Sequence, residues 1–156
     1  MSRAFLAVAV AALLWSGVAS AQGPGQAVRD FVTLQGCIKS KPGAEESCLG
    51  VVSDPCLQNT GGTTVEMSNC LQREQSIWDD VLNETFKRLR EKLDDAQKIK
   101  LRDMQRAWIA SRDKTCAFYW DFSQGTMAVP MSAECASRET ARRAIFLLRF
   151  LLDDHK

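Results

Sequence analysis

Beyond residue 63, apolar residues recur three and four positions apart, and no run of residues alternates with a period of two. The clearest pattern spans Thr64 to Leu93, with apolar positions at Cys70, Ile77, Trp78, Val81, Leu82, Phe86 and Leu89. Charged residues occupy the opposite side, so the pattern predicts a long amphipathic helix. Thr63 and Glu66 have the spacing of a capping box at its start.

Two further long helices are predicted after this one. Asp94 and Asp95 interrupt the pattern and can cap a second helix over residues 96–120, whose apolar side holds Ile99, Leu101, Met104, Trp108, Cys116 and Tyr119. A loop is expected over residues 123–132, and Ser132 is expected to cap a third helix. Because the third helix is apolar on nearly every side, we expect it to be central, covered by the other two and by the N-terminal segment.

Shorter helices are predicted closer to the N-terminus, over residues 28–39 and 45–57, with Pro55 ending or bending the second. The predicted fold class is therefore all-α. We expect a disulfide-stapled antiparallel three-helix bundle with an additional N-terminal helical hairpin. In this scheme residues 22–62 form the cysteine-containing hairpin and residues 63–156 form the helical domain.

The first 21 residues have the features of a signal peptide. A positive start precedes an apolar run over residues 4–18, and Ala-Ser-Ala at 19–21 matches the pattern that signal peptidase cleaves. The run is shorter than the roughly 20 apolar residues of a comfortable membrane span. The first cysteine after the predicted cleavage site is Cys37, so we expect no stable membrane anchor after cleavage. The protein is expected to be periplasmic or secreted.

Export changes the interpretation of the six cysteines. An even number of cysteines in an oxidising compartment indicates a disulfide framework. Turn and loop signals between neighbouring cysteines suggest sequential pairing, namely Cys37–Cys48, Cys56–Cys70 and Cys116–Cys135. The first four cysteines each have an alternative partner nearby, so other pairings of these four stay open.

Composition and motifs narrow the function. The 20 Lys and Arg residues balance 19 Asp and Glu residues, giving a net charge of +1, and no basic cluster suggests nucleic-acid binding. The only histidine is His155, and no cysteine pair has zinc-site spacing. Glu134 and Glu139 are five positions apart and point to different sides of a helix, unlike a glycosidase carboxylate pair. We therefore expect no enzymatic activity, no metal and no cofactor.

A polar network is predicted between the long helices. Its candidate members are Asp79, Asn83, Trp108, Arg112, Thr140 and Arg143. Arg112 lies four positions after Trp108, beside the apolar seam, where an unpaired guanidinium is costly. Asp79 and Asn83 are its candidate partners. The network either fixes how two helices cross or binds a partner, in which case the guanidinium of Arg112 is the group that binds the ligand.

Tryptophans and acidic clusters are candidates for a partner surface. Trp78, Trp108 and Trp120 are either core residues or interface anchors, and Trp120, close to a loop, suits the second role best. The local acidic clusters are Glu45-Glu46 and Asp94-Asp95, each of which is either a partner-facing patch or solvated surface.

Several motifs from residue 63 onward resemble a known family. They are the run Thr63–Cys70, Trp78-Asp79, Leu82-Asn83, the run Gln105–Cys116 (Gln-Arg-Ala-Trp-Ile-Ala-Ser-Arg-Asp-Lys-Thr-Cys), Cys135, and Thr140–Arg143. Over residues 63–152 the chain resembles the lysozyme inhibitor LprI-like N-terminal domain family. The resemblance implies a helical, disulfide-bonded envelope protein that blocks lysozyme, and it supports pairing Cys116 with Cys135.

The leading hypothesis is therefore an exported, non-enzymatic binding protein whose partner is lysozyme and whose contact occludes the enzyme's sugar cleft. The alternative is an envelope structural or assembly factor that binds another bacterial protein through its N-terminal hairpin.

Overall fold

The computed structural model describes residues 24–153, which form helices and connecting turns without a strand among them. The elements are α1 (Pro24–Ser40), the 3-10 helix η1 (Glu45–Cys48), α2 (Ser53–Gln58), α3 (Thr64–Glu91), α4 (Asp95–Ser123) and α5 (Ala128–Leu152). The prediction of an all-α fold is confirmed. The predicted signal peptide, residues 1–21, lies outside the described residues.

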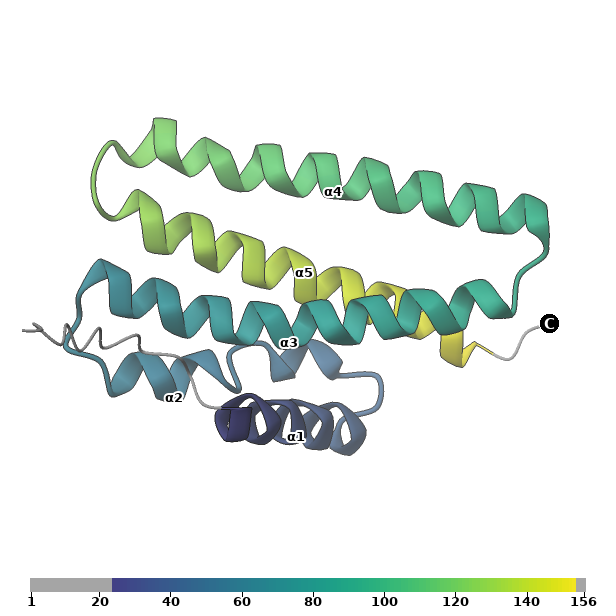
Figure 1. Ribbon diagram of the computed structural model, residues 1–156, viewed down its shortest axis with the longest axis horizontal. Coiled ribbons are helices and arrows are strands. Elements are labelled where there is room, and N and C mark those ends of the chain that lie inside the picture. Colours follow the sequence, from purple (N-terminus) through teal and green to yellow (C-terminus); the bar gives the residue numbers. More distant parts are fainter. Residues whose placement is uncertain (1–23, 154–156) are drawn as a thin grey trace, which may run out of the picture.

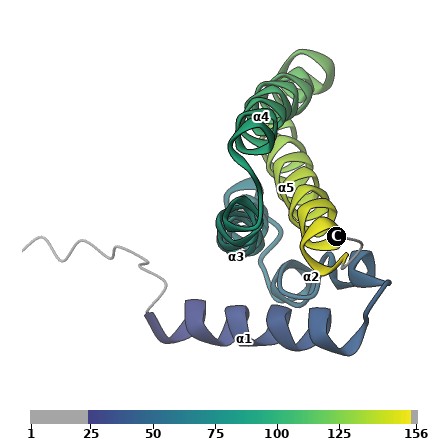
Figure 2. The same ribbon diagram turned by 90° about the vertical axis from the view of Figure 1, so that its right-hand side faces the viewer.

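The three long helices α3, α4 and α5 each run antiparallel to the next along the chain (Figure 1). α5 is the central one, because it packs against α3, α4 and η1. Its Ala144 and Leu147 have no exposed surface. Figure 2 shows that α4 lies at the far side of this layer, away from α1 and α2. The prediction that the third long helix is central is confirmed.

The core lies mainly between α3 and α5 and extends to the N-terminal helices. Trp78 and Leu82 of α3, Ile145 of α5 and Leu34 of α1 are almost completely buried in one continuous cluster. Burying each such side chain stabilises the fold by roughly 1.5–3 kcal/mol. The apolar periodicity of the two helices thus becomes the surface along which they pack.

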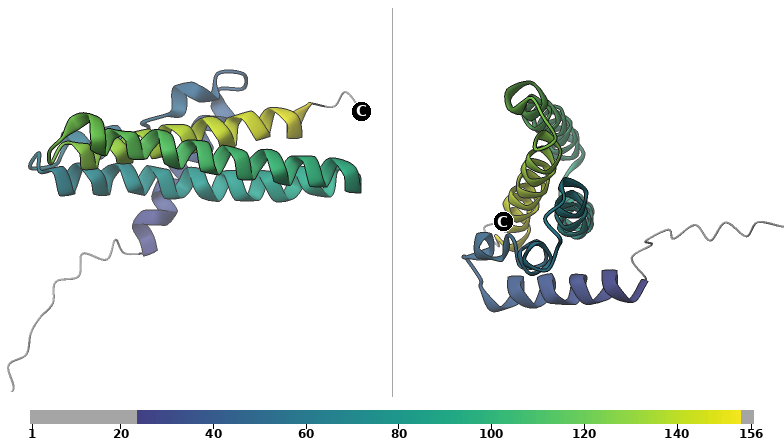
Figure 3. Two further views of the ribbon diagram at one scale, coloured as in Figure 1. Left: turned by 90° about the horizontal axis from the view of Figure 1, so that it is seen from above. Right: turned by 90° about the vertical axis from the view of Figure 1, so that its left-hand side faces the viewer.

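α1 runs across α3 rather than along it, as the end-on view in Figure 2 and the view from above in Figure 3 both show. Leu34 inserts into the core at this crossing. One turn before it, the Asp30 carboxylate accepts hydrogen bonds from Nε and Nη2 of Arg73 on α3, with Nη2 to Oδ2 at 2.8 Å. This bidentate ion pair fixes the orientation of α1 on the bundle.

The predicted second helix of the hairpin, residues 45–57, is wrong as a single element. The chain forms η1 and α2 instead, and Gly50 between them has a φ of 91°, which glycine adopts without strain. Pro55 does not end α2 but lies in its first turn, where a missing N–H costs no helical hydrogen bond. α1 also begins earlier than predicted, at Pro24.

The predicted loop over residues 123–132 is too long, and Ser132 is not a helix cap. α4 continues to Ser123 and α5 already begins at Ala128, so the connection is a tight turn. Pro130 falls within the predicted loop, but it occupies the first turn of α5, where its missing N–H costs no helical hydrogen bond. The predicted capping box of Thr63 and Glu66 forms at the start of α3, and Asp94 caps α4 as expected, with Gln97 completing a second capping box.

All six cysteines are paired in sequential order, which confirms the suggested connectivity. Cys37–Cys48 joins α1 to η1, Cys56–Cys70 joins α2 to α3, and Cys116–Cys135 joins α4 to α5. Each bridge therefore closes one junction between successive elements. Within residues 24–153, no helix combines the length and the apolar character that crossing a bilayer requires.

Candidate functional site

Four of the predicted polar residues meet where α4 packs on α5. The Trp108 ring lies near two guanidinium groups, with its centroid 4.9 Å from Cζ of Arg112 and 5.5 Å from Cζ of Arg143. Nη1 of Arg112 donates to Oγ1 of Thr140 at 3.3 Å, so the arginine links the two helices. Thr140 is fully buried, and its hydroxyl donates back to the carbonyl of its own helix at Ala136.

The carboxylate that pairs with Arg112 is not one of the predicted candidates. Nε and Nη2 of Arg112 donate to Oδ1 of Asp113, at 3.0 and 2.8 Å. Asp79 and Asn83 instead hydrogen-bond to each other on α3, at 3.0 Å. Arg112 and Asp79 do not meet because α4 packs along α5. The two side chains lie on either side of an open polar groove. The expected pairing is therefore wrong, although the two side chains line the same groove.

Arg143 is the most unusual charged group of this seam. Its side chain is buried, with 9% of the residue exposed, and Nε donates to Oε1 of Gln105 at 2.8 Å. Its Nη2 is inaccessible to solvent and has no hydrogen-bond partner. No carboxylate within residues 24–153 pairs with it. Burial lowers the pKa of Arg143 below its ordinary value, because desolvation disfavours the charged form.

Arg143 lines an open groove of about 320 Å³ between α4, α5 and η1, which we call the arginine groove. Its lining residues are Glu46, Trp108, Glu139, Arg142, Arg143, Ile145, Phe146 and Arg149. Arg142 pairs with Glu139 at 2.9 Å, and Arg149 approaches Glu46 at 3.5 Å. The charges within each of these two ion pairs neutralise each other. The groove therefore has one positive charge without a counterion, and this charge is on Arg143.

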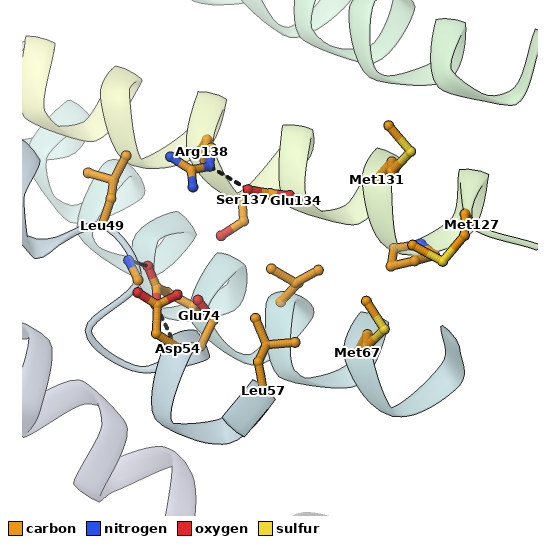
Figure 4. A pocket seen from close by; sticks show the side chains of 14 residues that line it. Leu49, Asp54, Leu57, Met67, Glu74, Met127, Met131, Glu134, Ser137 and Arg138 are labelled. Atoms are coloured by element: carbon orange, nitrogen blue, oxygen red, sulfur yellow. Dashed lines mark hydrogen bonds and ion pairs between the residues drawn. The ribbon is translucent and has the colours of Figure 1, made fainter. Parts of the chain in front are cut away.

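A second cavity, of about 140 Å³, lies between α2, α3 and α5 (Figure 4). Its walls are apolar at one end, where Leu57, Met67 and Met127 lie, and polar at the other, where Glu74 and Ser137 lie. At the polar end the carboxylate of Glu74 already accepts hydrogen bonds from the backbone N–H groups of Gly50, Val52 and Ser53.

Glu74 is an important residue that the sequence analysis missed. It is almost completely buried, and its carboxylate accepts hydrogen bonds from the backbone N–H groups of Gly50, Val52 and Ser53 and from Nε1 of Trp78, at 2.6–3.2 Å. Four donors replace the lost hydration. Its signal in the sequence is an acid on the apolar stripe of α3, one turn before Trp78.

The three candidate tryptophans have different environments. Trp78 is a core residue, and Trp108 is half-buried at the α4–α5 seam. Trp120 is half-exposed near the end of α4, which agrees with the role of an interface anchor. On another side of this end, the rings of Phe118 and Phe122 stack with centroids 6.2 Å apart, and both are exposed.

The acidic clusters are less available than the sequence suggests. Glu45 is buried, and Oε1 accepts a hydrogen bond from the N–H of Gly43 at 2.8 Å. That hydrogen bond, more than the nearby Arg149, lowers the pKa of Glu45. Asp94 accepts from the N–H of Gln97 as a helix cap, and its neighbour Asp95 pairs with Lys98 at 3.0 Å. Glu45-Glu46 is therefore not a free acidic patch.

Comparison with known proteins gives one informative match. The sequence model of the family described as lysozyme inhibitor LprI matches residues 56–147, which is more than half of the chain. No curated protein and no solved structure matches. The matched range begins within α2 and ends within α5, so it includes the Cys56–Cys70 and Cys116–Cys135 disulfides. It also includes Trp108 and Arg143 of the arginine groove. Among residues 24–153, no group of His, Cys, Asp and Glu side chains is arranged to hold a metal ion.

Proposed function

Because the chain belongs to the lysozyme inhibitor LprI family, we propose that it is an exported, non-enzymatic protein that inhibits lysozyme by covering the enzyme's sugar cleft. The family match over residues 56–147 is the observation that carries this proposal. At the family level it supports a lysozyme-inhibitor-like function and a protein partner. The inhibition would be stoichiometric, because it would result from binding alone and not from catalytic turnover by this chain.

The scaffold supports such a role. Each of the three disulfides closes a junction between two successive elements, and together they lie on both sides of the bundle, which limits the conformational freedom that a binding surface would otherwise lose on association. Disulfides persist in oxidising compartments, and they suggest a protein that acts outside the cytoplasm. We propose that residues 1–21 are the signal peptide and that the mature protein is periplasmic or secreted.

We propose that one face of α4 makes the contact. Of this helix only Leu101 and Cys116 are buried, so most of its surface is free of the bundle. Trp108, Phe118 and Phe122 follow one another at spacings that keep them on one side of the helix. Exposed aromatic side chains are the preferred anchors of protein interfaces. This stripe joins the arginine groove to the exposed end of α4.

The decisive experiment is an assay of lysozyme turnover with the purified mature protein, using lysozymes of several classes. We expect inhibition that saturates near a 1:1 ratio with at least one class. The variant Phe118→Ser/Phe122→Ser should weaken inhibition by about tenfold or more. The matched control is Val28→Ser/Val32→Ser on α1, because these valines are 62% and 63% exposed and the phenylalanines 61% and 71%. Unchanged turnover with every class of lysozyme would overturn the proposal.

The alternative, an envelope structural or assembly factor, is favoured by one observation on α1. Val28, Phe31 and Val32 are exposed at helical spacing and form an apolar stripe that nothing within residues 24–153 covers. In this proposal residues 22–62 are an accessory hairpin that exposes the apolar stripe to a partner. Residues 63–156 are the helical domain to which the hairpin is attached.

Deleting residues 22–62 would not test this alternative cleanly, since it also removes the donors to Glu74 and leaves Cys70 without its partner. The full-length Val28→Ser/Val32→Ser variant preserves both. If a bacterial envelope protein co-purifies with the native chain and is lost with this variant, the assembly role is supported. Equal co-purification with both proteins would contradict it.

A further inference from the structure

We propose that the arginine groove binds a carboxylate of the partner protein and that Arg143 is the guanidinium that receives it. The inference rests on the proposed function, because it specifies the chemistry by which a protein partner is held. It concerns one acidic side chain of that partner, seated between α4 and α5.

The first argument is the unused donor capacity of Arg143. A guanidinium has five N–H donors, and in this side chain only Nε has a partner, the amide oxygen of Gln105. Nη1 also lacks a hydrogen-bond partner and, unlike Nη2, is not shielded from solvent, so Nη1 is the donor that a ligand in the groove can reach. By contrast, Arg112 uses all three of its nitrogens on Asp113 and Thr140.

The second argument is charge. Arg142 and Arg149 at the rim have glutamate partners, while Arg143 has none. The groove therefore has a single uncompensated positive charge, which matches one carboxylate and not a doubly charged phosphate. Glu46 and Glu139 at the rim would also disfavour a second negative charge on the ligand.

The third argument is the setting of the guanidinium. The rings of Trp108 and Phe146 lie 5.5 and 5.2 Å from Cζ of Arg143. They stabilise the cation through their faces and restrict the guanidinium to one plane. A planar, preorganised guanidinium in partly desolvated surroundings is a favoured partner of a carboxylate, because opposite charges strengthen the hydrogen bond between them. Trp108 also belongs to the α4 stripe, so a partner that covers the stripe reaches the groove.

The test measures binding of lysozyme to the native protein and to Arg143→Gln, by titration calorimetry with a lysozyme that the native protein inhibits. We expect Arg143→Gln to weaken binding by about 30-fold or more. The matched control is Arg138→Gln, an exposed arginine of the same helix that pairs with Glu134, and we expect it to bind like the native protein. Because Arg143 is buried, thermal unfolding must show that its variant is folded.

A second variant keeps the inference testable if Arg143→Gln does not fold. Arg142→Gln/Arg149→Gln leaves Arg143 in place but removes the cations that neutralise Glu139 and Glu46. The two glutamates should then repel an incoming carboxylate, and binding should weaken by about tenfold. If folded variants of both designs bind lysozyme with native affinity, the inference is overturned while the proposed function stands.

If the native protein binds no lysozyme, the proposed function fails and the groove is tested alone. The probes are the blocked amino acids N-acetylglutamate amide and N-acetylglutamine amide, added separately to the native protein. The readout is the NMR signal of the Nε–H group of Arg143, assigned by its loss in Arg143→Lys. A shift with the glutamate probe alone supports a carboxylate site, and no shift, or equal shifts with both probes, overturns it.

Discussion

Two buried charged residues show how the same physical constraint has opposite outcomes in this protein. Glu74 has four N–H donors around its carboxylate, three of them from the backbone before and at the start of α2. Arg143 has one partner and no counterion. Burying a charge is tolerated where hydrogen bonds replace water. Glu74 therefore holds the fold together, whereas Arg143 is poised for an external partner.

Replacing Glu74 with glutamine should be strongly destabilising. The amide keeps one acceptor oxygen but directs an NH₂ group at backbone N–H groups, so at least one buried donor is left unsatisfied. We expect a loss of about 2–4 kcal/mol in the free energy of unfolding, measured by urea denaturation. The matched control is Glu84→Gln on the exposed side of α3, which should change stability by less than about 0.5 kcal/mol. Equal effects of the two variants would contradict the role given to Glu74.

Glu45 should make stability depend on pH in the acid range. The N–H of Gly43 lowers its pKa below the ordinary value of 4.5, so the folded state holds this proton less tightly than the unfolded state. Its contribution is thus complete above about pH 4.5 and is lost as the pH falls through the folded-state pKa.

The measurement is the free energy of unfolding at a series of pH values on the acid side of neutrality. The variant Glu45→Gln should lose stability less steeply than the native protein below the ordinary pKa of glutamate, since it has no proton to take up at this position. Glu84→Gln serves again as the control, because it removes an exposed carboxylate of α3 and leaves the hydrogen bond between Gly43 and Glu45 in place. Parallel profiles for native protein and Glu45→Gln would show that the hydrogen bond with Gly43 does not couple to folding.

At the scale of single elements, α4 is the least embedded of the long helices. It is 29 residues long, yet only Leu101 and Cys116 are buried. It is stabilised at its start by the capping box of Asp94, along its length by Arg112–Thr140 and Gln105–Arg143, and near its end by Cys116–Cys135. A helix attached along one narrow stripe leaves the rest of its surface for a partner.

The turn that ends α4 contains one strained residue. Gln124 has a φ of 37° and a ψ of 61°, the left-handed conformation that glycine adopts at little cost. Gln124→Gly should therefore stabilise the protein by about 0.5–1 kcal/mol, measured as a rise in the thermal midpoint. Ser123→Gly, in the last helical position, should instead lower the midpoint. A lower midpoint for Gln124→Gly would show that the side chain makes a contact worth more than the strain.

At the scale of the whole molecule, α3 and α5 form the centre, and the other elements are attached on two sides. The N-terminal elements are held by the Asp30–Arg73 ion pair, by the donors to Glu74 and by the Cys56–Cys70 bridge. α4 is held by the seam with α5 and by the Cys116–Cys135 bridge. The proposed lysozyme contact lies on the α4 side, and the apolar stripe of α1 lies on the other.

Removing the bridge on the α4 side should loosen that side selectively. Cys116→Ser/Cys135→Ser should cost about 3 kcal/mol in the free energy of unfolding, and hydrogen exchange should accelerate first at the C-terminal end of α4. Cys37→Ser/Cys48→Ser is the control, because it opens the junction of α1 and η1 and should leave the exchange of α4 unchanged. Uniform acceleration across the molecule in both variants would argue against two separately attached sides.

Several features of this protein follow from the sequence alone, because each depends on neighbouring residues. The period of α3 and the capping boxes of Thr63 and Asp94 involve contacts within one or two helical turns. The cysteine pairs close short loops, so the turn signals between them were informative about connectivity. The helix boundaries near Pro55 and Pro130 were predicted wrongly, because proline suits the first turn of a helix as well as it suits a loop.

What the tertiary structure alone decided is which side chains meet across helices. Whether Arg112 pairs with Asp79 or Asp113 depends on α4 lying along α5 and away from α3, which no local pattern specifies. The role of Glu74 likewise needed the break at Gly50, which turns backbone N–H groups toward a helix more than 20 residues away in sequence. Hydrogen-bond partners and unsatisfied donors such as Nη2 of Arg143 depend on atoms a few ångströms apart in space, and helical periodicity fixes which side a residue faces but not what lies opposite it.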